Sequence, residues 1–186
     1  METIEKILRE VTEQYIADHV KKGNTDLTKL ETEIMQLFKM RCMNANMYAR
    51  KRDPKLQIPQ RLDFARIAQI LCAALYVKAV TPPNAKKPEL MLWDGRIYAP
   101  DKKTIRLKAI ELNSCLTDTA LQRVENRMLL LADTAEPYTG KQYIAYRNGI
   151  LDTESGELKP FDPDIVFLSF KNKELTPGVK HDMKED

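Results

Sequence analysis

Asp152, Glu157 and Lys159 are the residues whose types and order come closest to a catalytic constellation. In metal-dependent nucleases with a D…ExK order, two acids bind Mg²⁺ and a lysine polarises the scissile phosphate. The two acids here are five positions apart, which is short for such a site. The turn residues between them, and Pro160 after Lys159, fit a β-hairpin more simply. We therefore expect no catalytic residue in this chain, with a nuclease as the alternative.

Other catalytic and cofactor motifs are missing from the sequence. The six glycines never form GxxxxGK followed by Ser or Thr, nor GxGxxG, so we expect no nucleotide hydrolysis and no cofactor in this chain. Neither histidine lies in the setting of a Ser/His/Asp triad. The cysteines are widely spaced and form no CxxC pair, so we expect reduced thiols and no metal site.

Basic residues gather in one window of the chain. Between Lys39 and Arg66 there are eight basic and two acidic residues, a local net charge of +6. From Asp152 onward there are nine acidic and five basic residues, a local net charge of −4. Such asymmetry favours an anionic partner, and we expect non-specific DNA binding, with a merely solvated surface as the alternative. The predicted DNA-binding residues are Arg50, Lys51, Arg52, Lys55 and Arg61.

The apolar periodicity predicts five helices that would position these residues. They span 3–21, about 27–41, 60–79, 102–116 and 118–133, with Thr25 or Asp26 capping the second and Thr117 or Asp118 the last. Pro54 and Pro59 predict a basic loop before the third helix. That third helix is apolar around much of its circumference, so we expect a large buried surface on it and possible self-association through it.

Turn residues between apolar runs predict two short β-hairpins. Asp94-Gly95 separates Leu90–Trp93 from the run that ends at Tyr98 and favours a type I′ turn. Asn148-Gly149 and the DTESG turn shape the second hairpin, and a strand is expected over 165–170. The fold class is therefore α+β, mostly helical with two short β-hairpins. For Trp93 and Tyr98 we expect packing on the hairpin, with base stacking as the alternative.

The order of these segments resembles a known family. IAQILCAALYVKAV…LMLWDGRIYAPD, two helices and NGILD…GEL are similar to the N-terminal, pre-motor domain of phage and plasmid primase-helicases of the poxvirus-type or satellite-phage-type superfamily-three helicase group. The likeness covers about residues 64–177. The matching hairpin residues are Trp93, Asp94, Gly95 and Tyr98, then Asn148, Gly149, Asp152, Gly156, Glu157 and Leu158.

The resemblance implies a DNA-engaging, ring-forming collar, hexameric in the parent protein, ahead of an ATPase motor. The chain itself has neither a Walker motif nor a primase signature, so no catalysis is implied here. We expect the N-terminal region of a phage or mobile-element replicative DNA helicase, with a small phage adaptor that binds a replication protein, and not DNA, as the alternative.

The expected organisation is a helical hairpin and basic loop (1–58), an α+β domain (59–177) and a polar tail or linker (178–186). No apolar run approaches the ~20 residues that a membrane span needs, so no membrane partner is expected. The N-terminus METIEKILRE lacks the apolar core of a signal peptide, which favours the host-cell cytoplasm.

Overall fold

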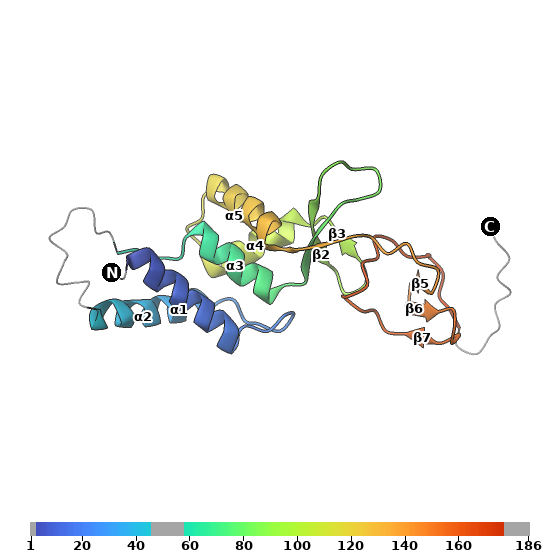
Figure 1. Cartoon of the computed structure of the whole chain (residues 1–186), viewed down its shortest axis with the longest axis horizontal. Helices are drawn as coiled ribbons and strands as arrows, with labels where there is room; N and C mark the ends of the chain where they lie inside the picture. Colours follow the sequence, from blue (N-terminus) through green and yellow to red (C-terminus); the bar gives the residue numbers. More distant parts are fainter. Residues whose placement is uncertain (1–2, 46–57, 177–186) are drawn as a thin grey trace.

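A computed structural model describes residues 3–45 and 58–176. In this part of the chain, five helices and two small sheets follow one another along an elongated molecule, with the helices at one end and the second sheet at the other (Figure 1). The predicted α+β class is confirmed.

The chain begins with two helices lying side by side, α1 (Ile4–His19) and α2 (Leu30–Asn44). Thr3 caps α1 by accepting a hydrogen bond from the Lys6 amide at 3.2 Å. The predicted cap of α2 at Thr25 or Asp26 was wrong, because Asp26 accepts from the Thr28 amide and closes a turn before the helix. The helix starts later and has no side-chain cap.

Three further helices complete the helical half: α3 (Phe64–Ala74), α4 (Lys102–Leu112) and α5 (Asp118–Leu131). Each begins with a side-chain cap, from Asp63, Asp101 and Thr117 respectively, so the predicted Thr117 cap is confirmed. One hydrophobic cluster contains side chains from all five helices. The predicted division at residues 58 and 59 stays a prediction, and the tail from 178 lies outside the described residues.

The predicted helix over 60–79 is shorter than expected. The helix ends at Ala74 because Leu75 already has extended backbone angles, and Val77–Val80 then form β1. The large aliphatic side chains of α3 are fully buried against the other helices, which confirms the expected burial. Since this chain itself covers them, α3 offers no apolar surface of that kind for self-association.

The first sheet has the order β3-β2-β1-β4. β1 pairs with β2 (Glu89–Trp93) in the antiparallel sense and with β4 (Asp133–Ala135) in the parallel sense. β2 also pairs with β3 (Tyr98–Ala99) in the antiparallel sense. Thus α5 ends before the predicted limit of 133, where Thr134 and the Glu136-Pro137 step favour extended backbone.

The second sheet is an antiparallel meander of β5 (Tyr143–Tyr146), β6 (Gly149–Asp152) and β7 (Leu158–Lys159). The strand predicted over 165–170 was wrong. This segment follows Pro160 and Pro163, and its backbone bonds run to two different parts of the chain: the Val166 carbonyl accepts from the Tyr138 amide and the Phe167 carbonyl from the Tyr98 amide, each at 2.8 Å. The segment therefore joins β3 of the first sheet to the stretch before β5, and Phe167 clusters with Ala145 and Ile150 of the second sheet.

No helix among the described residues is long and apolar enough to cross a membrane.

Candidate nucleic-acid interface

Four of the five predicted DNA-binding residues, Arg50, Lys51, Arg52 and Lys55, lie outside the described residues. The fifth, Arg61, lies between α2 and the end of α4. Its Nη1 atom is 3.4 Å from Glu31 Oε2 and 3.4 Å from Asn113 Oδ1. The same Glu31 accepts a hydrogen bond from the Leu62 amide at 3.0 Å. Arg61 thus connects α2 with the end of α4. To bind DNA, it would have to give up its half-exposed ion pair with Glu31 for a phosphate.

The other described cations of the same window are also largely engaged by carboxylates. Arg66 is buried, with Nη1 3.7 Å from Asp63 Oδ2 and Nη2 bonded to the Glu5 carbonyl. Arg41 Nη2 lies 3.7 Å from Glu10 Oε2. Lys39 lines a polar groove beside Arg61 and has no ion pair among the described residues. Among the described residues of this window, Lys39 is therefore the cation without an ion pair, while Arg41, Arg61 and Arg66 are engaged by carboxylates.

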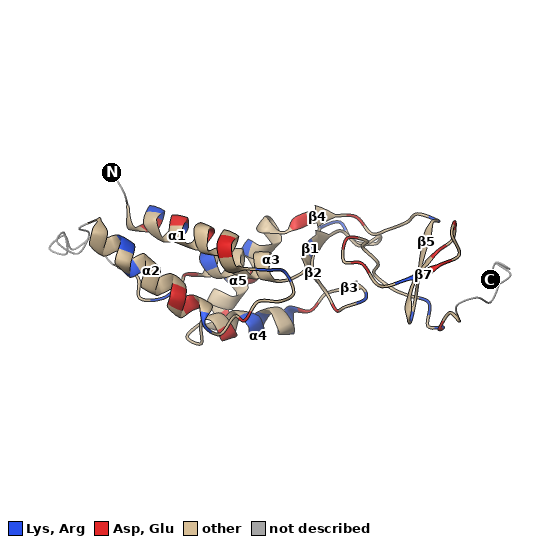
Figure 2. Ribbon diagram, turned by 90° about the horizontal axis from the view of Figure 1, so that it is seen from below, with Lys and Arg blue, Asp and Glu red and all other residues tan. Residues whose placement is uncertain are grey.

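Sequence reasoning did not single out two other lysine pairs that the structure exposes. Lys86-Lys87 lies in the loop between β1 and β2, and Lys102-Lys103 opens α4. Figure 2 shows basic residues on α4. None of the four has an ion pair within the described ranges. Cations in the first turn of a helix oppose its macrodipole, so Lys102 and Lys103 are not placed there to stabilise α4. The KK doublets were the only signal in the sequence.

The first family-motif hairpin is held by Asp94 and Gly95. Asp94 Oδ1 accepts hydrogen bonds from the Arg96 amide at 2.8 Å and the Ile97 amide at 2.9 Å. The Asp94 amide also bonds to the Ile97 carbonyl, so Gly95 and Arg96 form the centre of the turn and the predicted type I′ turn centred on Asp94-Gly95 was wrong by one residue. Gly95 has φ +101°, which favours glycine.

The aromatic residues of this hairpin pack inside the protein. Tyr98 is almost fully buried, its hydroxyl donates to the Pro163 carbonyl at 2.8 Å, and burial raises its pKa to about 12. Trp93 is half-buried and meets the edge of Tyr76 at 5.3 Å between ring centroids, and its Nε1 is buried without a hydrogen-bond partner in the described part of the chain. Base stacking therefore has no access to Tyr98.

The second hairpin turns at Arg147-Asn148, and Gly149 is the first residue of β6, paired with Tyr146. The Asn148 side chain donates to the Leu175 carbonyl at 2.9 Å and accepts from the Leu175 amide at 3.0 Å, which fixes the segment after the second sheet. Gly149 has φ +156°, and a Cβ there would meet the Lys159 carbonyl oxygen at 2.6 Å. Both residues therefore shape backbone.

Asp152 and Gly156 form the turn between β6 and β7. Asp152 is buried, and its Oδ2 atom accepts from Lys159 Nζ at 2.6 Å, which lowers the pKa of Asp152 and raises that of Lys159. Its Oδ1 accepts from the Glu154 amide, and Gly156 takes φ +72°. Lys159 thus neutralises the acid, where a nuclease would direct it to phosphate. No cluster of three or more metal-ligating side chains occurs in the regions 3–45 and 58–176.

Residues 163–175 thus connect the two motif hairpins. Tyr98 of the first hairpin bonds to Pro163 and Phe167, and Asn148 of the second bonds to Leu175. Their motif residues make turns and anchors, and none forms a catalytic arrangement. Neither models of known protein families nor curated proteins match this chain.

Proposed function

We propose that this chain is the N-terminal, DNA-engaging and ring-assembly region of a phage or mobile-element replicative DNA helicase of the primase-helicase type. A separate motor domain would supply ATP hydrolysis. The observation that carries the proposal is the order of two turn-defined hairpins around the pair α4 and α5, together with the shared segment that joins both hairpins. This order is the one that the sequence resemblance rests on.

DNA would be held through its phosphates. Lys39 has no ion pair among the described residues, and the other expected contacts are the predicted loop residues Arg50, Lys51, Arg52 and Lys55. Binding through lysine and arginine side chains to phosphates is independent of base sequence and weakens steeply with salt. We therefore expect non-specific affinity, with dissociation constants of about 10⁻⁴ to 10⁻⁶ M at physiological salt.

A protein-binding adaptor is the second candidate, and one observation favours it. Three large apolar side chains of α2 (Leu37, Met40 and Met43) are exposed along one side of the helix. Exposed apolar surface of this kind is typical of contacts with another protein. The adaptor would use this surface and would not bind DNA.

The test compares DNA binding by three proteins in a fluorescence anisotropy titration at low salt. These are the wild type, the variant R50A/K51A/R52A/K55A, and the control variant K21A/K22A/K141A/K173A, which loses four exposed lysines elsewhere. The proposal predicts weaker binding by the first variant and near wild-type binding by the second. Equal binding by all three would exclude the loop as the contact, and absence of binding by the wild type would favour the adaptor.

A further inference from the structure

We propose that copies of this chain associate head to tail, with the exposed face of α4 from one copy seated in the groove between α1 and α2 of the next. This inference deepens the ring-assembly part of the proposed function and rests on it. The two surfaces are complementary in polarity and charge, and DNA binding does not depend on this contact.

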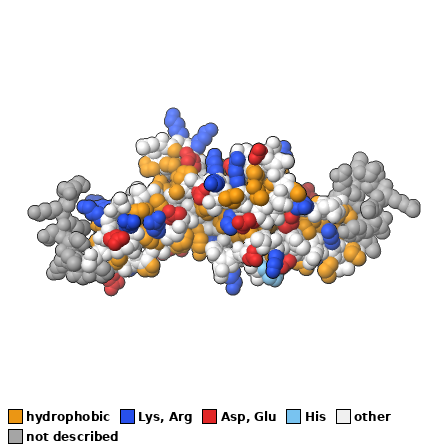
Figure 3. Space-filling model, turned by 180° about the vertical axis from the view of Figure 1, so that it is seen from behind, with side chains coloured by type: hydrophobic (Ala, Val, Ile, Leu, Met, Phe, Trp, Pro, Cys, Tyr) orange, Lys and Arg blue, Asp and Glu red, His pale blue; other side chains and the backbone are white. Residues whose placement is uncertain are grey.

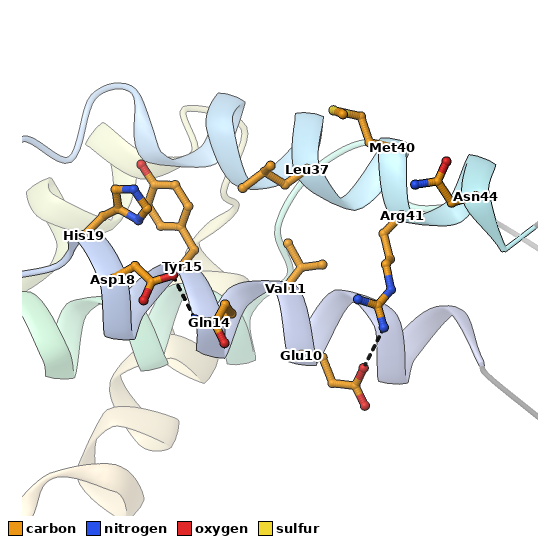
Figure 4. Close-up of a pocket in the computed structure, with 10 residues that line it drawn as sticks. All are labelled: Glu10, Val11, Gln14, Tyr15, Asp18, His19, Leu37, Met40, Arg41 and Asn44. Carbon is orange, nitrogen blue, oxygen red and sulfur yellow. Dashed lines mark hydrogen bonds and ion pairs between the residues drawn. The ribbon is translucent and has the colours of Figure 1, made fainter.

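The groove between α1 and α2 has a volume of about 470 Å³. Val11 of α1 and Leu37 of α2 lie on its facing sides, and Met40 extends the apolar lining along α2 (Figure 4). Leu37 and Met40 are 44% and 61% exposed, so the described chain leaves both open to solvent. Apolar side chains lining an open groove are the usual acceptor for an amphipathic helix.

The α4 face presents an apolar stripe of its own. Leu107 and Ile110 are 51% and 39% exposed and lie on one side of the helix with Lys103, at spacings of three and four residues. Seen from behind, basic side chains stand beside apolar surface in the central part of the molecule (Figure 3). Leu107 and Ile110, with Lys103 beside them, are therefore suited to pack into a groove that has apolar and acidic side chains.

The charges of the two surfaces are opposite. From Glu10 to His19, α1 carries three carboxylates and neither lysine nor arginine, and two of these acids, Glu10 and Asp18, line the groove. By contrast, α4 carries four basic residues, of which Arg106 and Lys108 pair with Glu125 and Glu111, so Lys102 and Lys103 are its cations without an ion pair among the described residues. Arg41 pairs with Glu10 on the groove rim, whereas Asp18 accepts a hydrogen bond from Gln14 and has no ion pair among the described residues, so Asp18 is the carboxylate that Lys103 of the incoming helix would meet. Complementary potentials of this kind set register and exclude the like-with-like contact.

The geometry of such a contact is heterologous, because the groove and the stripe are different surfaces of the same chain. In a head-to-tail dimer one copy keeps an unused groove and the other keeps an unused stripe, so further copies can add. The assembly closes into a ring when the rotation between neighbouring copies permits it. A two-fold dimer built on α2 alone would instead bring the same acidic groove against itself.

Sedimentation velocity over a range of protein concentrations tests the contact. Met40→Asp places a charge in the groove and Leu107→Asp places one on the stripe, and both side chains are exposed, so circular dichroism should show an unchanged fold. The control is Leu130→Asp, because Leu130 is 76% exposed and belongs to neither surface. We expect the wild type and the control to self-associate alike, and each of the other variants to weaken the association at least about tenfold.

Mixing the two variants separates this contact from any symmetric one. In the Met40→Asp protein the stripe is intact, and in the Leu107→Asp protein the groove is intact, so an equimolar mixture should form one-to-one dimers that grow no further. A mixture that stays monomeric would overturn the head-to-tail contact, as would a wild type that is monomeric at every concentration. If that monomeric wild type still binds DNA, only the interface is wrong, and the proposed function stands.

Discussion

Replacing Gly149 by alanine tests whether the Asn148-Gly149 motif is needed for backbone reasons. Two costs add at this position. An alanine at φ +156° takes a backbone conformation that costs roughly 1–3 kcal/mol. Its Cβ would also lie 2.6 Å from the Lys159 carbonyl oxygen of β7, so the strand must shift, and such overpacking costs about 1–3 kcal/mol more.

Gly156 supplies the matched control in the same sheet. It also has a positive φ, +72°, but a Cβ there meets nothing within 4 Å. Gly156→Ala should therefore cost only the backbone part, and Gly149→Ala should exceed it by about 1–3 kcal/mol. The total for Gly149, about 2–6 kcal/mol, is a large share of the roughly 5–15 kcal/mol of a typical domain.

The assay is urea unfolding together with amide hydrogen exchange over residues 143–159. The second sheet has its own small hydrophobic cluster, so it can open locally, and exchange reports this where a global unfolding curve would not. Gly149→Ala should speed exchange across β6 and β7 far more than Gly156→Ala does. Equal effects of the two substitutions would refute the close approach of β7 as the reason for glycine at 149.

Two further predictions concern stability. The pKa of Asp152 is lowered by Lys159 from an ordinary value of 3.8, so the pair stabilises the folded state above that pH and loses this contribution as pH falls through the folded-state pKa. Asp152→Asn should therefore be less stable than wild type at pH 7, and urea titrations should show the gap narrowing below about pH 4, whereas a gap independent of pH would count against the pair. Ile70→Ala should cost about 2–5 kcal/mol in urea unfolding because Ile70 is fully buried, and a cost as small as that of the exposed Leu130→Ala would contradict the described core.

The sequence predicted those parts of the fold whose signals are local. The periodicity of α4 and α5, the Thr117 cap and the two hairpins near Gly95 and Gly149 depend on neighbours a few residues away, although the exact turn residues differ from those predicted. β1 and β4 were missed because they are short and pair across a long sequence separation, with Lys78 beside Asp133. A run such as YVKAV reads equally well as the end of an apolar helix until its pairing partner is known.

The candidate site was less predictable for the same reason. Arg61 reads as a free cation in the sequence, but Glu31 lies 30 positions away and engages it in the fold. Tyr98 reads as a hairpin aromatic, yet a carbonyl from Pro163 holds its hydroxyl in the interior. The groove between α1 and α2 depends on how two helices pack, which periodicity alone does not specify.

The salt dependence of DNA binding tests the proposed function most directly. Four phosphate contacts by Arg50, Lys51, Arg52 and Lys55 should contribute about −3.6 to the slope of log K against log salt concentration on duplex DNA, and about −2.8 on single strands. We predict that R50A/K51A/R52A/K55A flattens the slope by up to these amounts, while K21A/K22A/K141A/K173A leaves it near that of the wild type. A slope that is the same in the wild type and in R50A/K51A/R52A/K55A would exclude these four residues as the contacts, and a wild type that does not bind DNA at low salt would contradict a DNA-engaging role for this chain.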